Sequence, residues 1–319
     1  MAAAAALAER ARPLASPNPG VGAMIVKHGK VVGRGWTMPG GRPHAEAVAL
    51  EQAGDAARGA TLYVTLEPCA HTSPRGPACA DLAAEAGLAR MVVGMRDPDA
   101  RTAGHGVVRI ADAGSEVVLL DWPPARLGLS GHAAALAHNR PHVTLKLAMS
   151  LDGCIATSTG ESQWITGEAA RAHGHRERAR ADAILVGGGT LRADNPRLDT
   201  RLPGLEHRSP RRVALTSGNV PDGWRAIRSP EAISSLEDVR YLLVEGGSQT
   251  ASAFLEAGFV DRLLIFRAPV LLGGGKPAIG EIGHPTLEAA FADGLVLMEL
   301  RALGSDTLEI YQAGIGKRG

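Results

Sequence analysis

The stretch Thr61-Leu-Tyr-Val-Thr-Leu-Glu-Pro-Cys69 decides the fold of the first half of the chain. Its first five residues are rich in β-branched and apolar side chains, which predicts a strand. A helix is predicted to begin at Cys79 and to stop at Gly87, before another apolar strand over residues 91–95. Strands that alternate with helices are typical of an α/β sandwich with a largely parallel sheet.

The elements around this stretch continue the same alternation. The Ala-rich opening predicts an amphipathic helix rather than a secretory signal, because charged residues interrupt it from Glu9 onward. A helix is expected from His44 to about Gln52, and a short helix ends at residues 110–113. The strands predicted in this half are residues 22–26, 30–34, 61–65, 91–95 and 116–120.

A second domain is predicted after residue 140. The chain has 319 residues, which is long for one compact core. The strand pattern stops between Trp122 and Pro141, where Ala and Leu dominate as in a linker helix. Buried strands then resume at residues 142–148, 183–187, 212–216, 241–245 and 263–267. We therefore predict two unrelated α/β domains, residues 1–140 and 141–319.

The composition limits the possible partners. There are 34 Lys and Arg against 33 Asp and Glu, and only 3% of residues are aromatic. Nucleic-acid binders usually have a basic surplus, so a small-molecule substrate is favoured over a nucleic acid. No run approaches the ~18 apolar residues of a membrane span, so no membrane partner is expected. The three cysteines form no disulfide framework, and thiolate ligands favour a reducing cytoplasm.

Four residues define a predicted metal site. His44, Cys69 and Cys79 supply one imidazole and two thiols, which are three of the four ligands that zinc prefers. A water at the fourth position makes such a site catalytic, and Glu46 is placed to move protons to and from that water. The order His-x-Glu, Pro-Cys and Cys is the signature of zinc-dependent nucleobase deaminases.

A structural zinc site is the alternative. His71 could then be the fourth ligand, but Glu46 would have no purpose. In the catalytic interpretation, Glu46 takes the proton of the water, delivers it to a ring nitrogen and helps to protonate the leaving amine. The long spacing between Cys69 and Cys79 departs from the CxxC of simpler deaminases, so the intervening loop is expected to hang over the pocket.

Three turns are candidate binding sites. Asn18 lies in a rigid Ser-Pro-Asn-Pro turn, where its carboxamide could bind a pyrimidine edge or simply stabilise the turn. Gly187-Gly-Gly-Thr190 and Glu245-Gly-Gly-Ser248 each follow a buried strand. Backbone amides at such glycines suit a phosphate, although neither turn matches GxGxxG and both could be tight connections only.

Longer motifs now identify a family. The chain resembles the bifunctional riboflavin-biosynthesis deaminase/reductase family over roughly residues 16–275. In the first half the resemblance rests on Ser16-Pro-Asn-Pro-Gly-Val-Gly-Ala, Pro43-His-Ala-Glu-Ala, Leu62-Tyr-Val-Thr-Leu-Glu-Pro-Cys-Ala-His71 and Asp97-Pro. In the second half it rests on Val143-Thr-Leu-Lys-Leu-Ala-Met-Ser-Leu-Asp-Gly153, Gly160-Glu-Ser-Gln-Trp-Ile-Thr166, Ala183-Ile-Leu-Val-Gly187, Thr190-Leu-Arg-Ala-Asp-Asn-Pro196 and Val244-Glu-Gly-Gly247.

The resemblance implies two consecutive reactions. A cytidine-deaminase-like α/β/α domain would deaminate 2,5-diamino-6-(5-phosphoribosylamino)pyrimidin-4(3H)-one. A domain similar to dihydrofolate reductase would then use NADPH to reduce the ribosyl group of 5-amino-6-(5-phosphoribosylamino)uracil to ribityl. One Zn²⁺ per chain and a homo-oligomer, either a dimer or a tetramer, are implied as well.

The resemblance also assigns residues to roles. The zinc ligands would be His44, Cys69 and Cys79, the proton shuttle Glu46, and the pyrimidine contacts Asn18, His71 and Asp97. The NADPH contacts would be Ala148, Trp164, Thr190, Asp194, Ser217, Gly246, Gly247 and Ser248. The substrate contacts of the reductase would be Lys146, Ser162, Arg178, Leu198, Arg201 and Glu245, with the two arginines gripping the ribose phosphate.

The chain departs from the family pattern in three places. Asp99 stands where the family commonly has Asn, and the loop between the cysteines is one residue longer. The segment from 217 to 244 is short for the strand and helix that the family usually has there. One rival hypothesis therefore keeps the deaminase and makes the second half a binding or oligomerisation module. Two others are a nucleic-acid-editing deaminase and a non-enzymatic zinc scaffold.

Overall fold

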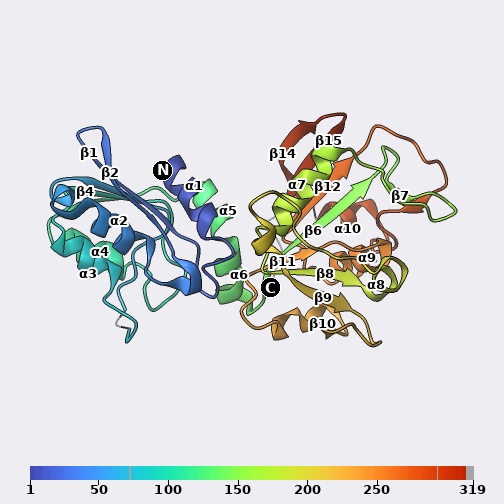
Figure 1. Ribbon diagram of the computed structural model, residues 1–319, viewed down its shortest axis with the longest axis horizontal. Helices are drawn as coiled ribbons and strands as arrows, with labels where there is room; N and C mark the ends of the chain where they lie inside the picture. Colours follow the sequence, from blue (N-terminus) through green and yellow to red (C-terminus); the bar gives the residue numbers. More distant parts are fainter. Residues whose placement is uncertain (72, 293, 314–319) are drawn as a thin grey trace. The chain divides into compact units, whose positions relative to one another are not determined.

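The protein consists of two compact units, Met1–Asn139 and Arg140–Gly319. Their structure is a computed structural model that describes residues 1–71, 73–292 and 294–313. Each unit has a sheet and a hydrophobic core of its own, shown as blue to green and as green to red ribbons in Figure 1. Both units are α/β, as the sequence predicts.

The first unit contains a five-stranded sheet in the order β2-β1-β3-β4-β5. Strand β1 is antiparallel to both β2 and β3, whereas β3, β4 and β5 are parallel. Four of the five strands therefore share one direction and only β1 opposes them, in agreement with the predicted largely parallel sheet. The strands are β1 (Gly22–Lys27), β2 (Lys30–Trp36), β3 (Thr61–Val64), β4 (Arg90–Val93) and β5 (Glu116–Leu119).

Helices cover both faces of this sheet (Figure 1). Helices α1 (Ala2–Ala11) and α5 (Pro123–Gly128) lie on one face. The other face carries α2 (Ala45–Ala53), α3 (Cys79–Glu85) and α4 (His105–Asp112), while α6 (Ser130–His138) follows α5. Short 3₁₀ turns cover Pro39–Gly41 and Gly54–Ala57. The result is an α/β/α sandwich, and the predicted single linker helix is two helices, α5 and α6.

Two glycines allow these helices to approach the sheet closely. A Cβ on Gly22 of β1 would lie 1.9 Å from the carbonyl oxygen of Ala4 in α1. A Cβ on Gly35 of β2 would lie 2.2 Å from the carbonyl oxygen of Ala45 in α2. Both separations are far below van der Waals contact, so any larger residue would push a helix away. The approach of α2 matters because its first turn carries His44 and Glu46.

The second unit contains an eight-stranded sheet in the order β10-β9-β8-β11-β6-β12-β15-β14. The first six strands are parallel, and β15 and β14 extend the sheet by antiparallel pairing. The parallel strands are β6 (His142–Met149), β8 (Ala183–Gly187), β9 (Arg211–Leu215), β10 (Trp224–Ile227), β11 (Tyr241–Val244) and β12 (Arg262–Arg267). The remaining strands are β7 (Cys154–Ala156), β13 (Lys276–Pro277), β14 (Leu295–Leu303) and β15 (Asp306–Ala313), with β7 paired to β13.

Helices of the second unit pack on a sheet whose central strands β8, β11 and β6 are largely buried. Phe254 of α9 belongs to the largest core cluster, and Ala170 of α7 packs in another with Leu308 and Ile310 of β15. The helices are α7 (Glu168–Arg178), α8 (Gly188–Asp194), α9 (Ser248–Glu256) and α10 (Leu287–Ala292). The short segment between residues 217 and 244 still forms β10 and a 3₁₀ turn over Pro230–Ser235.

A buried ion pair fixes the start of the second unit. The guanidinium of Arg140 donates to both carboxylate oxygens of Asp261, at 2.7 and 3.1 Å. Asp261 also accepts the backbone N–H of Val143 at 2.8 Å, so one carboxylate joins the chain before β6 to the chain before β12. Within the described ranges, no helix has both the length and the apolar character that a membrane crossing requires.

Candidate functional site

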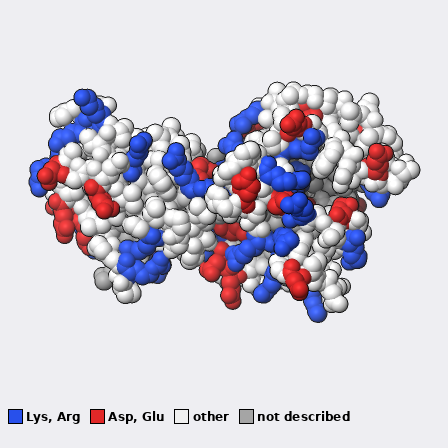
Figure 2. Space-filling view, in the orientation of Figure 1, with Lys and Arg blue, Asp and Glu red and all other residues white. Residues whose placement is uncertain are grey.

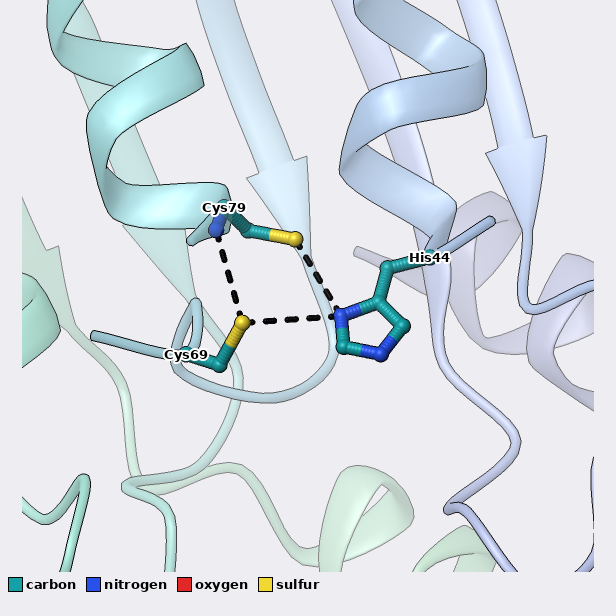
Figure 3. Close-up of side chains that lie close together, drawn as sticks. All are labelled: His44, Cys69 and Cys79. Atoms are coloured by element: carbon teal, nitrogen blue, oxygen red, sulfur yellow. Dashed lines mark hydrogen bonds between the residues drawn. The ribbon is translucent and has the colours of Figure 1, made fainter. Parts of the chain in front are cut away.

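Three element ends bring the predicted metal ligands together. His44 is the N-cap residue of α2, Cys69 lies in the loop after β3, and Cys79 is the first residue of α3. The Nδ1 atom of His44 lies 3.2 Å from the sulfur of Cys79 and 3.5 Å from the sulfur of Cys69 (Figure 3). The backbone N–H of Cys79 donates to the sulfur of Cys69 at 3.4 Å. All three donor atoms lie within 4.8 Å of one another.

This donor set has the dimensions of a tetrahedral zinc site. Zinc binds imidazole nitrogen at about 2.0–2.1 Å and thiolate sulfur at about 2.3 Å, which places the nitrogen and sulfur ligands about 3.5 Å apart. The observed separations of 3.2 and 3.5 Å match that geometry. His71 makes a hydrogen bond elsewhere, from Nδ1 to the hydroxyl of Thr102 at 3.2 Å, and is absent from the metal-ligand cluster of the described residues.

The ionisable groups at the cluster have strongly shifted pKa values. Complete burial raises the pKa of Glu46 to about 7, while the neighbouring His44 opposes that rise. Hydrogen bonds from Cys79 and His44 lower the pKa of the Cys69 thiol to about 4, against the effect of its burial. The pKa of Cys79 is raised because it holds the proton shared with Cys69 and is itself buried. A bound cation would favour the thiolate form of both sulfurs.

Glu67 is a structural residue that sequence analysis did not single out. Its side chain is 2% exposed, and its carboxylate accepts four backbone N–H groups. One oxygen accepts from Asp97 and Gly104 at 3.2 and 3.0 Å, and the other from Gly106 and Val107 at 3.0 and 3.2 Å. Glu67 therefore ties the metal-binding loop to residues 97–107, where α4 begins.

A pocket of about 280 Å³ opens beside the metal ligands. Asn18, His71 and Asp97, the predicted pyrimidine contacts, all line it together with His44, Glu46 and Cys69. The amide of Asn18 donates to the carbonyl oxygen of Gly41 at 3.0 Å, which holds the side chain against the turn over residues 39–41. Of the residues predicted for the first site, only Cys79 is not in the lining of this cavity, and its sulfur lies 3.2 Å from Nδ1 of His44, which is.

The pocket also contains residues that sequence analysis missed. His132 of α6 has its Nε2 atom 3.6 Å from a carboxylate oxygen of Asp97. Arg42, Thr37 and Arg101 complete part of the wall. Nothing in the sequence pattern marks His132, because its neighbours in α6 look like an ordinary Ala-rich helix.

Asp99, which stands where the family commonly has Asn, forms an ion pair with Arg101. Both of its carboxylate oxygens accept the guanidinium of Arg101, one of them at 2.9 Å from Nε. This pairing lowers the pKa of Asp99 to about 2. The pair lies at the mouth of the pocket, where an amide side chain in place of the carboxylate would leave the arginine charge unpaired.

A wider cavity of about 770 Å³ lies in the second unit. Two turns in which glycines leave the backbone amides uncovered by side chains form part of its lining. They are Gly187–Gly189 at the start of α8 and Gly247 before α9. Of the residues predicted for NADPH, Thr190, Ser217, Gly247 and Ser248 line this cavity, whereas Ala148, Trp164, Asp194 and Gly246 do not. A Cβ on Gly187 would lie 2.2 Å from the hydroxyl of Thr250, so this turn has no room for a side chain.

Three of the predicted substrate residues of the second unit, Lys146, Arg178 and Glu245, form a charged cluster. The carboxylate of Glu245 accepts Nε and Nη2 of Arg178 at 2.8 and 2.9 Å, and Lys146 Nζ lies 3.8 Å from the same carboxylate. Arg178 also donates to the carbonyl oxygen of Asp199 at 3.1 Å. The Glu245 side chain is largely buried, which raises its pKa, but Lys146 and Arg178 outweigh that effect and lower the pKa to about 2.

The other predicted substrate residues of the second unit, Leu198, Arg201 and Ser162, lie outside this ion-pair cluster. Leu198 is buried and adopts φ +53°, a left-handed conformation that non-glycine residues seldom adopt. The Nε atom of Arg201 lies 3.4 Å from the Asp199 carboxylate, and its backbone N–H donates to His175. Ser162 is exposed.

Family models match both units. The model described as "Cytidine and deoxycytidylate deaminase zinc-binding region" matches residues 1–95, and the model described as "RibD C-terminal domain" matches residues 141–308. These matches fall on the two units separately. They agree with the deaminase-like and reductase-like folds predicted from the sequence.

Similar proteins match nearly the whole chain. The riboflavin biosynthesis protein RibD of Aquifex aeolicus is 37% identical over 322 residues, covering 89% of this chain and 90% of the relative. The protein of the same name from Corynebacterium ammoniagenes is 41% identical, covering 88% of each. A solved diaminohydroxyphosphoribosylaminopyrimidine deaminase/5-amino-6-(5-phosphoribosylamino)uracil reductase from Thermotoga maritima is 31% identical, with a TM-score of 0.86 over 98% of this chain and 97% of that chain. The chain therefore belongs to the RibD family of bifunctional deaminase/reductase proteins of riboflavin biosynthesis.

Proposed function

We propose that this chain catalyses both reactions named for its Thermotoga relative. The first unit would deaminate 2,5-diamino-6-(5-phosphoribosylamino)pyrimidin-4(3H)-one. The second would reduce the ribosyl group of the resulting 5-amino-6-(5-phosphoribosylamino)uracil to ribityl. The observation that carries the proposal is the His44, Cys69 and Cys79 cluster with buried Glu46 beside it, in a chain that also has an open glycine-lined cavity in its second unit.

In the first unit, His44, Cys69 and Cys79 would hold the zinc ion. Zinc, when bound, makes a water molecule nucleophilic at neutral pH. The Glu46 carboxylate would accept one proton from that water and pass it to a nitrogen of the pyrimidine ring. It would then carry the second proton of the same water, released by the hydroxyl group added to the ring carbon, to the leaving amine. Burial of Glu46 favours the protonated form and so supports its role as a proton carrier.

The polar walls of the first pocket suit a pyrimidine. The carboxamide of Asn18 can both donate and accept at a ring edge. His71 and Asp97 offer a further imidazole and carboxylate on the same cavity, and Glu67 fixes the loop that carries Asp97. These side chains would orient the ring so that the carbon bearing the amino group faces the metal.

In the second unit, Thr190, Ser217, Gly247 and Ser248 would bind NADPH, which supplies the hydride. Backbone amides of Gly188 and Gly247 at the helix starts suit the cofactor phosphates. Lys146, Arg178, Arg201 and Glu245 would bind the substrate. Arg178 uses Nε and one terminal nitrogen for Glu245, so a phosphate would take the remaining donors of its guanidinium or those of Arg201.

A small-molecule substrate agrees with the distribution of charge. Acidic and basic side chains are interspersed on the visible face, with one group of Lys and Arg over the part of the second unit where Figure 1 draws α7 (Figure 2). We place the enzyme in the cytoplasm because its metal site requires reduced thiols, and we propose that it forms a homo-oligomer.

A coupled assay on the diamino substrate tests both activities. The wild-type protein should release ammonia without NADPH, and it should oxidise NADPH only after deamination has occurred. Glu46→Gln should lower ammonia release by a factor of about 10²–10⁴, the usual contribution of a general acid–base. Its zinc content and its NADPH oxidation with the deaminated product should not change.

The matched control is Glu51→Gln, an exposed residue of the same helix. It should behave as the wild type in both halves of the assay. Full ammonia release by Glu46→Gln would remove Glu46 from the reaction. Failure of the folded wild-type protein to oxidise NADPH with the deaminated product would refute the reductase and favour a second unit that only binds.

A further inference from the structure

Two cations face the wide cavity of the second unit without a carboxylate partner. Arg192 and Lys276 both line this cavity of about 770 Å³. In the described part of the chain they are the only charged side chains of the lining, and neither forms an ion pair. A cavity that is lined by charges of one sign attracts ligands of the opposite sign. The cavity therefore suits a ligand that carries more than one negative group.

The guanidinium of Arg192 lies against the first turn of its own helix, α8. A Cβ on Gly188 would lie 3.0 Å from Nη1 of Arg192 and 2.6 Å from the hydroxyl oxygen of Thr216. Both groups therefore lie beside Gly188, close enough for one phosphate to accept a hydrogen bond from each. The Thr216 oxygen accepts the backbone N–H of Gly218 at 3.1 Å, and its own O–H can still donate.

The order of the strands indicates how a dinucleotide would lie in this cavity. For hydride transfer, the nicotinamide must reach the substrate cluster at β6 and β11, where Lys146 and Glu245 lie. From β11 the sheet continues through β8 to β9. With the pyrophosphate at the glycine turn after β8, the adenosine would lie at the end of β9. Thr216 and Ser217 follow that strand directly, and both line the cavity.

On the basis of the proposed reductase function, we propose that Arg192 binds the 2′-phosphate of NADPH and makes the enzyme prefer NADPH to NADH. The two cofactors differ only in this phosphate, and a phosphate monoester carries about 1.5–2 negative charges at pH 7. A guanidinium can donate two parallel hydrogen bonds to phosphate oxygens, and the hydroxyls of Thr216 and Ser217 can add others. In Rossmann folds an arginine accommodates this phosphate, whereas a carboxylate binds the free 2′-hydroxyl of NADH.

Lys276 belongs to another part of the cavity wall. It lies in β13, which pairs with β7 outside the large sheet. Its Nζ atom would lie 3.3 Å from a Cβ on Gly160, and it is not among the atoms nearest to Gly188. Lys276 is therefore assigned to the part of the cofactor that NADPH and NADH share. The same substitution at the two cations separates binding of the 2′-phosphate from a general attraction of anions.

Binding of two adenosine fragments tests the assignment without turnover. In isothermal titration calorimetry, the full-length zinc-loaded protein should bind adenosine 2′,5′-bisphosphate more tightly than adenosine 5′-monophosphate. Arg192→Gln should raise the Kd of the bisphosphate at least tenfold, which corresponds to about 1.4 kcal/mol, and should leave the Kd of the monophosphate within twofold. The control Arg176→Gln, on an exposed arginine of α7 outside the cavity lining, should leave both constants unchanged.

Steady-state kinetics of the reductase give a second measurement. In Arg192→Gln, the ratio of kcat/KM for NADPH to kcat/KM for NADH should fall at least tenfold. The change should lie mainly in the KM for NADPH, because the 2′-phosphate is remote from the transferred hydride. Arg192→Glu should lower the ratio further, since its carboxylate repels the phosphate and can accept the 2′-hydroxyl of NADH. Lys276→Gln should change both values by the same factor and leave their ratio as in the wild type.

Three outcomes would overturn the proposal. Equal binding of the two fragments by the wild type would show that no group recognises the 2′-phosphate. An unchanged preference in Arg192→Gln would place that phosphate elsewhere. Loss of the preference in Lys276→Gln alone would assign the phosphate to Lys276. Failure of the reductase itself gives a different result, because the wild type would then prefer the bisphosphate but oxidise neither NADPH nor NADH.

Discussion

The hydrogen bonds of Glu67 make a prediction about the loop at residues 97–107. In Glu67→Gln, one carboxylate oxygen becomes an NH₂ group that cannot accept a hydrogen bond. Two of the four N–H donors, either those of Asp97 and Gly104 or those of Gly106 and Val107, then lose their acceptor. The backbone around Gly106 cannot easily move to compensate, since a Cβ there would lie 2.1 Å from the carbonyl oxygen of Pro68.

The magnitude follows from the number of bonds lost. A hydrogen bond to a charged group contributes about 1.5–3 kcal/mol, so two of them contribute about 3–6 kcal/mol. Each factor of ten in an opening equilibrium corresponds to about 1.4 kcal/mol. The smaller figure therefore predicts that the amides of residues 97–107 exchange with solvent at least about 100-fold faster in Glu67→Gln than in the wild type.

Hydrogen–deuterium exchange of peptides from this loop measures the effect directly. The KM for deamination should rise because Asp97 leaves the pocket wall, whereas NADPH oxidation with the deaminated product should stay the same. Glu51→Gln, which exchanges an exposed glutamate of α2, is the matched control. Exchange within threefold of the wild type would show that the four bonds do not hold the loop, and the reasoning would fail.

Three further predictions concern separate parts of the chain. The pKa of Glu245 is about 2 instead of 4.5, so its ionised form stabilises the second unit above pH 4.5. On the order of 3 kcal/mol of the free energy of unfolding should be lost as the pH falls towards 2. In Glu245→Gln, the denaturant midpoint of the second unit should fall less steeply over the same pH range. His132→Ala should raise the deamination KM about tenfold with unchanged zinc content, because Asp97 loses its imidazole neighbour; an unchanged KM would make His132 a packing residue. Removal of zinc by a chelator should abolish ammonia release but leave NADPH oxidation with the deaminated product, and simultaneous loss of both would contradict separate sites.

The elements that carry strong local signals were predictable. The ends of α2 and α3 follow from the His44 and Cys79 positions and from the glycines that stop these helices, so the metal cluster could be predicted residue by residue. The alternation of strand and helix in the sequence predicted a largely parallel sheet, and β2, β3, β4 and β5 do run in the same direction. The opposed direction of β1 follows from its antiparallel pairing with β2, to which a two-residue turn connects it.

The parts that depend on contacts distant in sequence were not predictable. His132 reaches the first pocket, and Thr102 reaches His71 in its wall, only because α6 and the loop before α4 fold beside the pocket. The strand β15 has a visible signal, since buried Leu308 and Ile310 alternate with Glu309, but it was overlooked. The strand β14 has no such alternation, because its apolar residues occupy both faces of an edge.

The amide of Cys79 that points to the sulfur of Cys69 affects how this site would treat its metal. A thiolate that accepts a hydrogen bond donates less electron density to a cation, so two anionic sulfurs need not quench the ion's Lewis acidity. The donor belongs to the main chain at the first residue of α3. Side-chain replacements therefore cannot delete it, and this adjustment of acidity persists for as long as the helix begins where it does.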